Sequence, residues 1–206
     1  MKFIVLIFKA IRKSYELCLS SIYTPLARLL LLLNGATVGN NLTVFGKLYV
    51  NVTRRGSLSI GENCSMNSGD EFNVIGRQQK CILWVEGNLQ IGNNVGLSAT
   101  AIICQLGITI GNNVKIGGNT VIYDTDFHSL NAEDRRHSDA DRKSTRRAKV
   151  VIEDDVFIGA HTTILKGVTI GKRSIIGAAS VVSKSIPPNE IWAGNPAAYI
   201  KDVLPQ

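Results

Sequence analysis

Two aspartates and a histidine alternate along the stretch YDTDFHSL, as Asp124, Asp126 and His128. Imidazole titrates near neutral pH, so a histidine can take a proton from an attacking group, and a neighbouring carboxylate can fix which ring nitrogen carries the hydrogen. Two-residue spacing does not decide whether Asp124 or Asp126 would hold His128. The alternative is that His128 is an ordinary exposed loop histidine.

The chain has two further histidines, His137 and His161. His137 lies among charged residues, and we expect it to be solvated. His161 follows FIGA and either lines a groove or lies on the surface. A site with three histidine ligands for zinc normally has two of them a few residues apart, whereas the separations here are 9 and 24 residues. We therefore expect no metal.

An aliphatic residue recurs every six positions on both sides of the YDTDFHSL stretch. A period of six fits neither an amphipathic helix nor a long flat strand, but it fits short strands whose aliphatic side chains point inward and stack from coil to coil. Glycine and asparagine, as in GNN at 92–94 and 111–113, suit the tight corners. The pattern predicts a parallel β-helix. Its positions are Val38, Val44, Val50, Ile60, Met66, Val85, Ile91, Leu97 and Ile103, then, after a one-residue slip, Ile110, Ile116, Ile122, Ile152, Ile158, Ile164, Ile170, Ile176 and Val182.

The repeat breaks off at residues 124–149, which are mostly polar and charged. Loops longer than about 12–15 residues inside a domain are usually functional or disordered. We divide the chain into an N-terminal helical segment (1–35), a β-helix domain (36–186) with this inserted loop (124–149), and a C-terminal extension (187–206).

The N-terminal segment predicts an amphipathic helix. At 100° per residue, Lys2, Lys9, Arg12, Lys13, Glu16 and Ser20 share an arc of roughly 100°, and apolar residues cover the rest. Pro25 is expected to end or kink the helix, with a second short helix reaching Leu33. The unbroken apolar runs fall short of the roughly 20 residues of a membrane span. The helix either caps the β-helix or lies on an anionic membrane surface, and one helix could do both.

Charge and cysteine content narrow the class of protein. The net charge of +7 suits phosphorylated ligands or anionic membranes, but the chain has none of the motifs of nucleic-acid-binding proteins. Four scattered cysteines form no C-x-x-C pair, so we expect reduced, mostly buried thiols in a cytoplasmic protein. These are Cys18, Cys64, Cys81 and Cys104.

Residues 150–201, from VVIEDDVFIGAHTTILKGVTIG to NPAAYIK, resemble the hexapeptide-repeat acyltransferases. The resemblance is to the galactoside and maltose acetyltransferase branch and to the O-acetyltransferases of bacterial polysaccharide synthesis. It implies a left-handed β-helix, a homotrimer with active sites between subunits, and acetyl-CoA as the acyl donor. It also places His128 on the catalytic position of an extended loop.

The same resemblance assigns further residues. Donor contacts fall on Ala160, Ala178, Ser183, Lys184 and Lys201, with the two lysines facing phosphate. The family often has arginine where this chain has Ala198 and Lys201. On the acceptor side Asp126 is a candidate, and Ser98 replaces a family asparagine.

These observations predict an acetyl-CoA-dependent O-acetyltransferase with His128 as general base and a saccharide acceptor in surface polysaccharide synthesis. The chain carries no nucleophile elbow, P-loop or dinucleotide fingerprint, which favours direct transfer in a ternary complex. Two alternatives remain: an N-acetyltransferase acting on an amino sugar, and a β-helix without enzymatic activity that serves as an interaction module. We expect a cytoplasmic location, with possible contact at the inner membrane surface.

Overall fold

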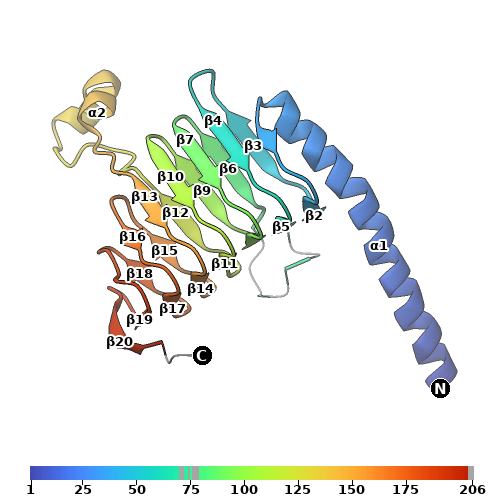
Figure 1. Ribbon diagram of the computed structural model, residues 1–206. Coiled ribbons are helices and arrows are strands. Elements are labelled where there is room, and N and C mark those ends of the chain that lie inside the picture. Colours follow the sequence, from blue (N-terminus) through green and yellow to red (C-terminus); the bar gives the residue numbers. More distant parts are fainter. Residues whose placement is uncertain (70–71, 74, 76–78, 204–206) are drawn as a thin grey trace.

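The computed structural model describes residues 1–69, 72–73, 75 and 79–203, and the side chains of Glu16 and Ser20 lie outside that description. Within it the chain forms a parallel β-helix of three sheets, preceded by one long helix (Figure 1). From β1 to β18, successive strands belong to successive sheets, so strands three places apart along the chain pair with each other. The parallel coil expected from the six-residue period is confirmed.

The sheets have the following strands. Sheet A contains β1 (Thr37–Val38), β4 (Ser57–Ile60), β7 (Asn88–Ile91), β10 (Gly107–Ile110), β13 (Val150–Ile152) and β16 (Thr169–Ile170). Sheet B contains β2 (Thr43–Phe45), β5 (Ser65–Asn67), β8 (Gly96–Ser98), β11 (Lys115–Ile116), β14 (Phe157–Ile158), β17 (Ile175–Ile176), β19 (Glu190–Ala193) and β20 (Ala198–Asp202). Sheet C contains β3 (Tyr49–Val52), β6 (Ile82–Val85), β9 (Ala101–Cys104), β12 (Val121–Tyr123), β15 (Thr163–Ile164) and β18 (Val181–Val182).

Aliphatic side chains stack in the interior as the period requires. One row per sheet follows the pairing register, and nearly all of its members are buried. The row of sheet A is Val38, Ile60, Ile91, Ile110, Ile152 and Ile170, and that of sheet C is Val50, Leu83, Ile102, Ile122, Ile164 and Val182.

The assignment of Ile103 to this interior row was wrong. Ile102 is the residue in register with Ile122, and Ile103 instead pairs with Trp84 and Tyr123, which are only partly buried. Strands β6 and β9 are four residues long and turn two side chains inward, so the longer strand accounts for the slip in the sequence period.

The tight turns between strands account for the recurring glycine and asparagine residues of the repeat. Asn63, Asn94 and Asn113 adopt left-handed backbone conformations with φ between 55° and 58°, which asparagine tolerates better than most residues. The glycine two residues earlier lies where coils touch: a Cβ on Gly61 would come within 2.7 Å of the Gly92 carbonyl. Side-chain amides bridge the corners, as in the 2.9 Å bond from Asn94 to Asn113.

The N-terminal segment is one helix, α1 (Lys2–Leu33), with Pro25 inside it, so the expectation that Pro25 ends the helix and a second one follows was wrong. The second half of α1 covers the first coil. Thr24 Oγ1 accepts a bond from Val44 N–H at 2.9 Å, Arg28 donates to the Gly39 carbonyl at 3.1 Å, and Leu31 is buried. Polar groups on the edge of the sheet are thereby satisfied.

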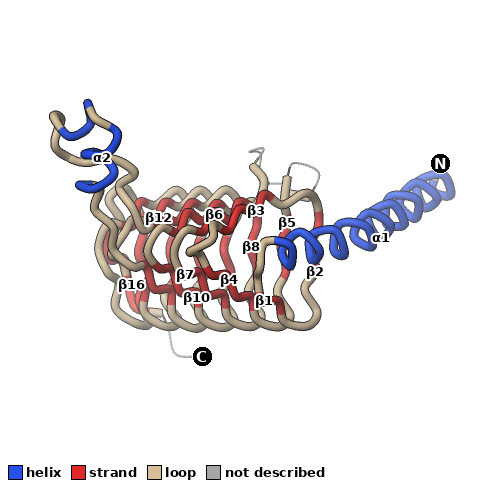
Figure 2. Tube along the Cα trace, turned by 90° about the horizontal axis from the view of Figure 1, so that it is seen from above, coloured by secondary structure: helices blue, strands red, loops and turns tan. Residues whose placement is uncertain are grey.

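The first half of α1 projects away from the β-helix, as Figures 1 and 2 both show. Its apolar side chains are exposed, including Phe3 (73%), Phe8 (64%) and Leu17 (61%). By length and composition α1 could cross a membrane, which differs from our estimate based on unbroken apolar runs.

The loop between β12 and β13 spans residues 124–149 and rises from the body of the molecule (Figure 1). It contains a 3₁₀ turn (Asp134–Arg136) and a short helix, α2 (Ser138–Ser144). At the other end of the domain the chain stays regular beyond residue 186, because β19 pairs parallel with β17 and β20 pairs antiparallel with β19.

Candidate active site

Asp124 anchors the base of the loop. Its carboxylate is buried and accepts hydrogen bonds from the backbone N–H groups of Gln105, Leu106 and Gly107, each at 2.7 Å. These three groups belong to the turn between β9 and β10, one coil earlier, so Asp124 ties the start of the loop to the coil beside it. The side chain is committed to this structural task, and among the described residues it forms no hydrogen bond with His128.

His128 is held by a different aspartate. Its Nδ1 atom lies 2.7 Å from Oδ2 of Asp141, which projects from α2. The other oxygen, Oδ1, accepts the backbone N–H of Ser129 at 2.6 Å. The expectation that Asp124 or Asp126 orients His128 was therefore wrong. Sequence spacing missed Asp141 because a short helix inside the loop brings it back across 13 residues.

The electrostatics of the pair fix the tautomer of the histidine. The hydrogen bond with His128, and then the bond from the Ser129 backbone, hold the pKa of Asp141 below its ordinary value. The ionised carboxylate can only accept hydrogen bonds, so Nδ1 must carry the hydrogen. In the neutral imidazole Nε2 then carries the lone pair, which is the form that a general base requires.

The backbone beside His128 is held in an uncommon conformation. Phe127 has φ of 63°, a region that a bulky residue adopts only under constraint, at a cost of order 1–3 kcal/mol. Its ring packs edge-on against Tyr123, with centroids 5.2 Å apart. The His128 side chain is 69% exposed, so the imidazole is accessible to a substrate.

Asp126 pairs with a lysine. Its Oδ1 lies 2.7 Å from Nζ of Lys166, on the next coil, while its Oδ2 is buried and has no hydrogen-bond partner among the described residues. Asp126 therefore has one unpaired carboxylate oxygen near the loop base, which is buried in this chain, and its role in substrate binding stays a prediction.

The candidate donor residues divide between two edges of the three-sided coil. Ala160 and Ala178 lie on adjacent coils at the edge between sheets B and C: Ala179 N–H donates to the Ala160 carbonyl at 2.8 Å, and a Cβ on Gly159 would lie 2.5 Å from Ala178 N. Ser98 ends β8 at the same edge. Exposed Ser183 and Lys184 follow β18 at the edge from which the His128 loop departs, and exposed Lys201 lies in β20.

Within one chain the predicted site residues are therefore not all brought together: Ser98, Ala160 and Ala178 share one edge, and His128 belongs to another. His161 also lies on the first edge, with φ of 63°, and its Nδ1 is buried without a partner among the described residues. His137 caps α2 and is exposed. In the described part of the chain, His, Cys, Asp and Glu side chains form no group of three or more that could hold a metal ion.

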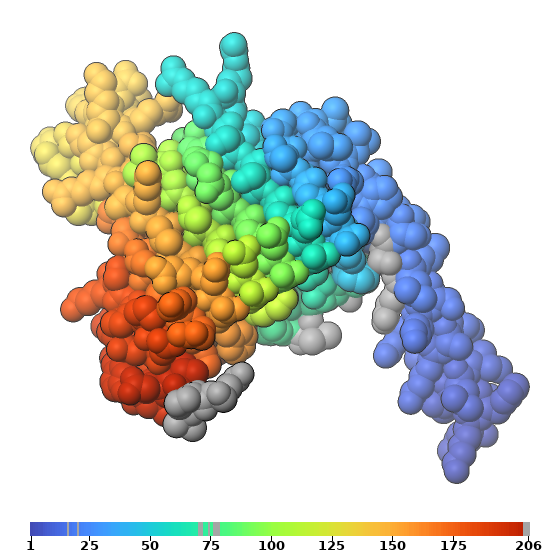
Figure 3. Space-filling view, in the orientation of Figure 1, coloured from blue at the N-terminus to red at the C-terminus, as the bar shows by residue number. Residues whose placement is uncertain are grey.

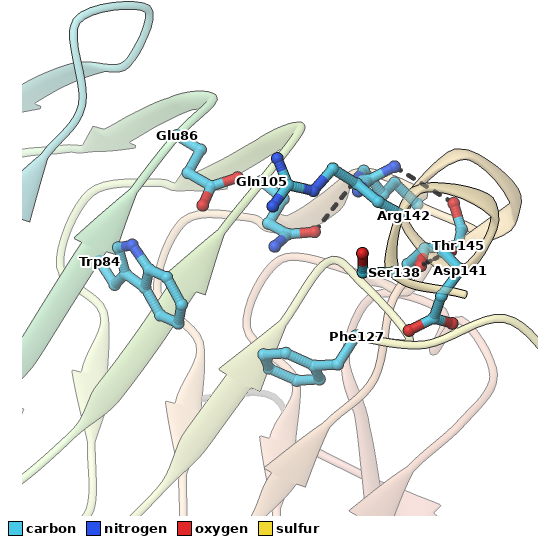
Figure 4. Close-up of a pocket in the computed structure, with 9 residues that line it drawn as sticks. Trp84, Glu86, Gln105, Phe127, Ser138, Asp141, Arg142 and Thr145 are labelled. Atoms are coloured by element: carbon cyan, nitrogen blue, oxygen red, sulfur yellow. Dashed lines mark hydrogen bonds between the residues drawn. The ribbon is translucent and has the colours of Figure 1, made fainter. Parts of the chain in front are cut away.

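A cavity of about 400 Å³ opens between α2 and the outer face of sheet C (Figure 4). Asp141 contributes to its wall, so the cavity adjoins the histidine pair. Trp84, Gln105 and Arg142 also line it. Sequence analysis did not identify these residues, although Trp84 is one of only two tryptophans in the chain.

Comparison with known proteins decides the family. Residues 149–184 match the family model for the bacterial transferase hexapeptide (six repeats), and residues 89–124 match the hexapeptide repeat of succinyl-transferase. The chain is 31% identical over 149 residues to WbbJ of Escherichia coli (strain K12), named as a candidate lipopolysaccharide biosynthesis O-acetyl transferase, and the match covers 71% of this chain and 72% of WbbJ. The chain belongs to the hexapeptide-repeat acetyltransferase family.

Other relatives agree with this family. Galactoside O-acetyltransferase of E. coli (strain K12) is 35% identical over 129 residues, a match that covers 58% of this chain and 61% of that protein. A hexapeptide-repeat acetyltransferase of Vibrio cholerae O1 biovar eltor, solved with acetyl coenzyme A, superposes with a TM-score of 0.58 at 26% identity, over 87% of this chain and 76% of its own. A galactoside acetyltransferase solved with coenzyme A gives 0.54 at 30% identity, over 82% and 65%.

Proposed function

We propose that this protein transfers an acetyl group from acetyl-CoA to a hydroxyl of a saccharide in surface polysaccharide synthesis. The observation that carries the proposal is the His128–Asp141 pair, on a loop that leaves a hexapeptide β-helix. The relatives are named for O-acetyl transfer to galactosides and in lipopolysaccharide biosynthesis, and two structural neighbours hold acetyl-CoA or CoA. The left-handed winding of that family is part of the proposal.

The chemistry follows from the tautomer. The acceptor hydroxyl oxygen attacks the thioester carbonyl while its proton passes to Nε2 of His128. The tetrahedral intermediate then collapses, the C–S bond breaks, and the imidazolium returns the proton to the leaving thiolate. Asp141 stays ionised throughout and stabilises the imidazolium. General-base catalysis of this kind contributes about 10²- to 10⁴-fold to the rate.

The divided donor residues support a homotrimer. With Ala160 and Ala178 on one edge and His128 on another, a complete site needs the loop of one subunit beside the edge of the next. Acetyl-CoA would then lie in the groove between subunits, with its pantetheine amides on backbone groups near Ala160 and Ala178 and its phosphates near Lys184 and Lys201, as point charges.

The first half of α1 supports contact with the cytoplasmic face of the membrane. Exposed Phe3, Ile4 and Phe8 form part of an apolar surface, and Lys9 and Lys13 lie on the opposite side of the helix. Such a helix binds anionic bilayers through burial of apolar area and attraction of its basic residues. The protein should sediment with vesicles containing anionic lipid more than with zwitterionic vesicles. Lys9→Gln with Lys13→Gln should reduce that binding, and equal binding to both vesicle types would contradict it.

The test of the proposed activity is release of free coenzyme A thiol from acetyl-CoA in the presence of hydroxyl and amino saccharides. Acceptor-dependent release with a hydroxyl sugar, abolished in His128→Ala, supports O-acetyl transfer. Release only with amino sugars would support N-acetyl transfer instead. If acetyl-CoA neither binds nor reacts, the interaction-module alternative is favoured.

A further inference from the structure

The cavity beside Asp141 is lined by groups of two kinds. Trp84 and Phe127 are aromatic, whereas Glu86, Gln105, Arg142 and Arg147 are polar or charged. Figure 4 shows the two rings along one side of the opening and Glu86, Gln105 and Arg142 along the other. Asp141 lines the cavity and also bonds His128 Nδ1, so the cavity reaches the residue that holds the candidate base.

Trp84 offers a platform for a sugar ring. It is an outward residue of β6, in register with Asn51 on one side and Ile103 on the other, and it is partly exposed. One face of a pyranose ring carries mainly C–H groups, which pack against an indole, while the hydroxyls at the ring edge remain free for polar partners. Gln105 and Glu86, on the neighbouring turns, can supply those partners.

Arginines dominate the charge along this edge of the β-helix. The turn between β3 and β4 carries Arg54 and Arg55, both exposed, and the loop carries Arg142. Among the described residues, none of these three arginines forms an ion pair or a side-chain hydrogen bond. Arg147 is held by Gln105 Oε1 at 2.9 Å and by the Thr145 carbonyl at 3.2 Å, which leaves its positive charge uncompensated.

The opposing negative charge is small. Asp141 is committed to His128 and to the Ser129 backbone, so Glu86 is the one carboxylate lining the cavity that has no such partner in the described structure. Guanidinium groups match the oxygens of phosphate in paired hydrogen bonds, and Arg is more weakly hydrated than Lys. The excess of guanidinium groups therefore favours an anionic ligand.

The arginines lie along a line of successive coils. Thr53 N–H donates to the Val85 carbonyl and Gly87 N–H to the Cys104 carbonyl, so the β3–β4, β6–β7 and β9–β10 turns follow one another toward the loop. At about 4.8 Å per strand spacing, three steps separate the Arg54–Arg55 turn from the loop by about 14 Å. Figure 3 shows the turn, in cyan, and the loop, in yellow, rising on either side of a hollow. That span exceeds one sugar ring.

We infer that the groove formed by the cavity beside Asp141 and the hollow between the Arg54–Arg55 turn and the loop binds the acceptor as a glycosyl phosphate or diphosphate. The sugar ring lies on Trp84, the reacting hydroxyl at His128, and the phosphates between Arg142 and the Arg54–Arg55 turn. The inference rests on the proposed acetyl transfer and names its class of substrate. A sugar diphosphate can come from a soluble nucleotide sugar or from an isoprenoid lipid carrier. The two sources share the chemistry that the groove recognises.

Equilibrium binding to the CoA-saturated protein tests the inference without turnover. The probes are methyl α-glucoside, glucose 1-phosphate, UDP-glucose and, in detergent, farnesyl diphosphoglucose. Because the chain has two tryptophans, a Trp192→Phe background makes Trp84 the sole indole, and its fluorescence reports a ring stacked on it. The phosphorylated probes should bind about tenfold tighter than the glucoside, a difference of about 1.4 kcal/mol, because only they can form charged hydrogen bonds with the arginines.

Substitutions test which side chains bind the phosphates and which binds the sugar ring. Arg142→Gln, and Arg54→Gln with Arg55→Gln, should each weaken the phosphorylated probes about tenfold and leave the glucoside unchanged. Trp84→Ala should weaken all probes, with partial recovery in Trp84→Phe. The matched control is Arg146→Gln, which removes an exposed arginine of the same loop that does not line the cavity. UDP-glucose binding tighter than the lipid probe indicates a soluble source, and the reverse indicates a lipid carrier.

Three results would overturn the inference: no binding of any phosphorylated probe, equal binding of charged and neutral probes, or equal losses in Arg142→Gln and Arg146→Gln. Acetyl-CoA binding, measured in parallel, keeps the two claims apart. If acetyl-CoA binds and the charged probes show no preference, the substrate class fails alone. If acetyl-CoA does not bind, the proposed function fails.

Discussion

His128 Nδ1 and Asp141 Oδ2 lie 2.7 Å apart, joined across 13 residues of one loop. The contact does two things. It fixes the hydrogen on Nδ1, and it closes the loop on itself, because Asp141 Oδ1 also accepts the Ser129 backbone N–H. Asp141 is a positioning residue that acts through His128.

Asp141→Asn should lower kcat about 10- to 100-fold and leave acetyl-CoA affinity unchanged, a smaller loss than the 10²- to 10⁴-fold expected for His128→Ala. The amide can donate as well as accept, so it no longer selects the productive tautomer. Steady-state kinetics with separate kcat and KM values check this, and Asp141→Glu should recover part of the rate. Asp139→Asn, an exposed aspartate on the same helix, is the control. A comparable loss in both asparagine variants would argue against a specific role.

The lowered pKa of Asp141 predicts how stability depends on pH. A carboxyl whose pKa is lower in the folded state binds fewer protons there than in the unfolded state. The stabilisation is therefore fully present above the ordinary carboxyl pKa and is lost as pH falls through the lowered value. The difference in denaturation midpoint between wild type and Asp141→Asn should be largest near neutral pH and should shrink in acid. A difference that grows toward acid pH would contradict this sign.

Asp124→Asn should destabilise the fold by about 2–4 kcal/mol, because three backbone N–H groups lose part of their acceptor, which is itself buried. Urea denaturation followed by circular dichroism measures the loss, and Asp139→Asn should stay within about 0.5 kcal/mol of wild type. Unchanged stability in Asp124→Asn would show that the loop base is held by other contacts.

The cysteines should react very unequally with a disulfide reagent at pH 8. Cys18 is exposed, whereas burial raises the pKa of Cys64, raises that of Cys81 to about 11 and, with the Asp124 carboxylate adding to the effect, raises that of Cys104 to about 12. Thiolates are the reactive form, so these three thiols should remain unmodified in the native state. Colorimetric titration should give one fast thiol in native protein and four after unfolding. Rapid modification of a second thiol in native protein would contradict the packing.

The coil could be predicted from sequence because each inward aliphatic residue reports directly on the six-residue period, as from Ile152 to Val182. The phase error at Ile103 arose where strands lengthen, since a four-residue strand has two inward positions and the period alone cannot choose between them. The turns that contain glycine and asparagine could also be predicted from sequence, because few residues tolerate the left-handed backbone conformation.

The site was less predictable because its contacts are long-range. Asp126 is two residues from His128 yet pairs with Lys166, and Asp141 is 13 residues away yet holds the imidazole. Pro25 was misjudged for a related reason: the second half of α1 is stabilised by packing on the first coil, through Thr24, Arg28 and Leu31, which outweighs the local preference to end the helix. The conformational preferences of a short segment do not include such tertiary contacts, so they could not be predicted from it.

The most direct test of the account is calorimetric titration of acetyl-CoA into wild-type protein and His128→Ala, followed by turnover of both with a saccharide acceptor. The account predicts comparable acetyl-CoA affinity in the two proteins and a loss of turnover of about 10²- to 10⁴-fold in the variant. If wild-type protein does not bind acetyl-CoA, or if His128→Ala turns over at the wild-type rate, the assignment of His128 as the base of an acetyltransferase is wrong.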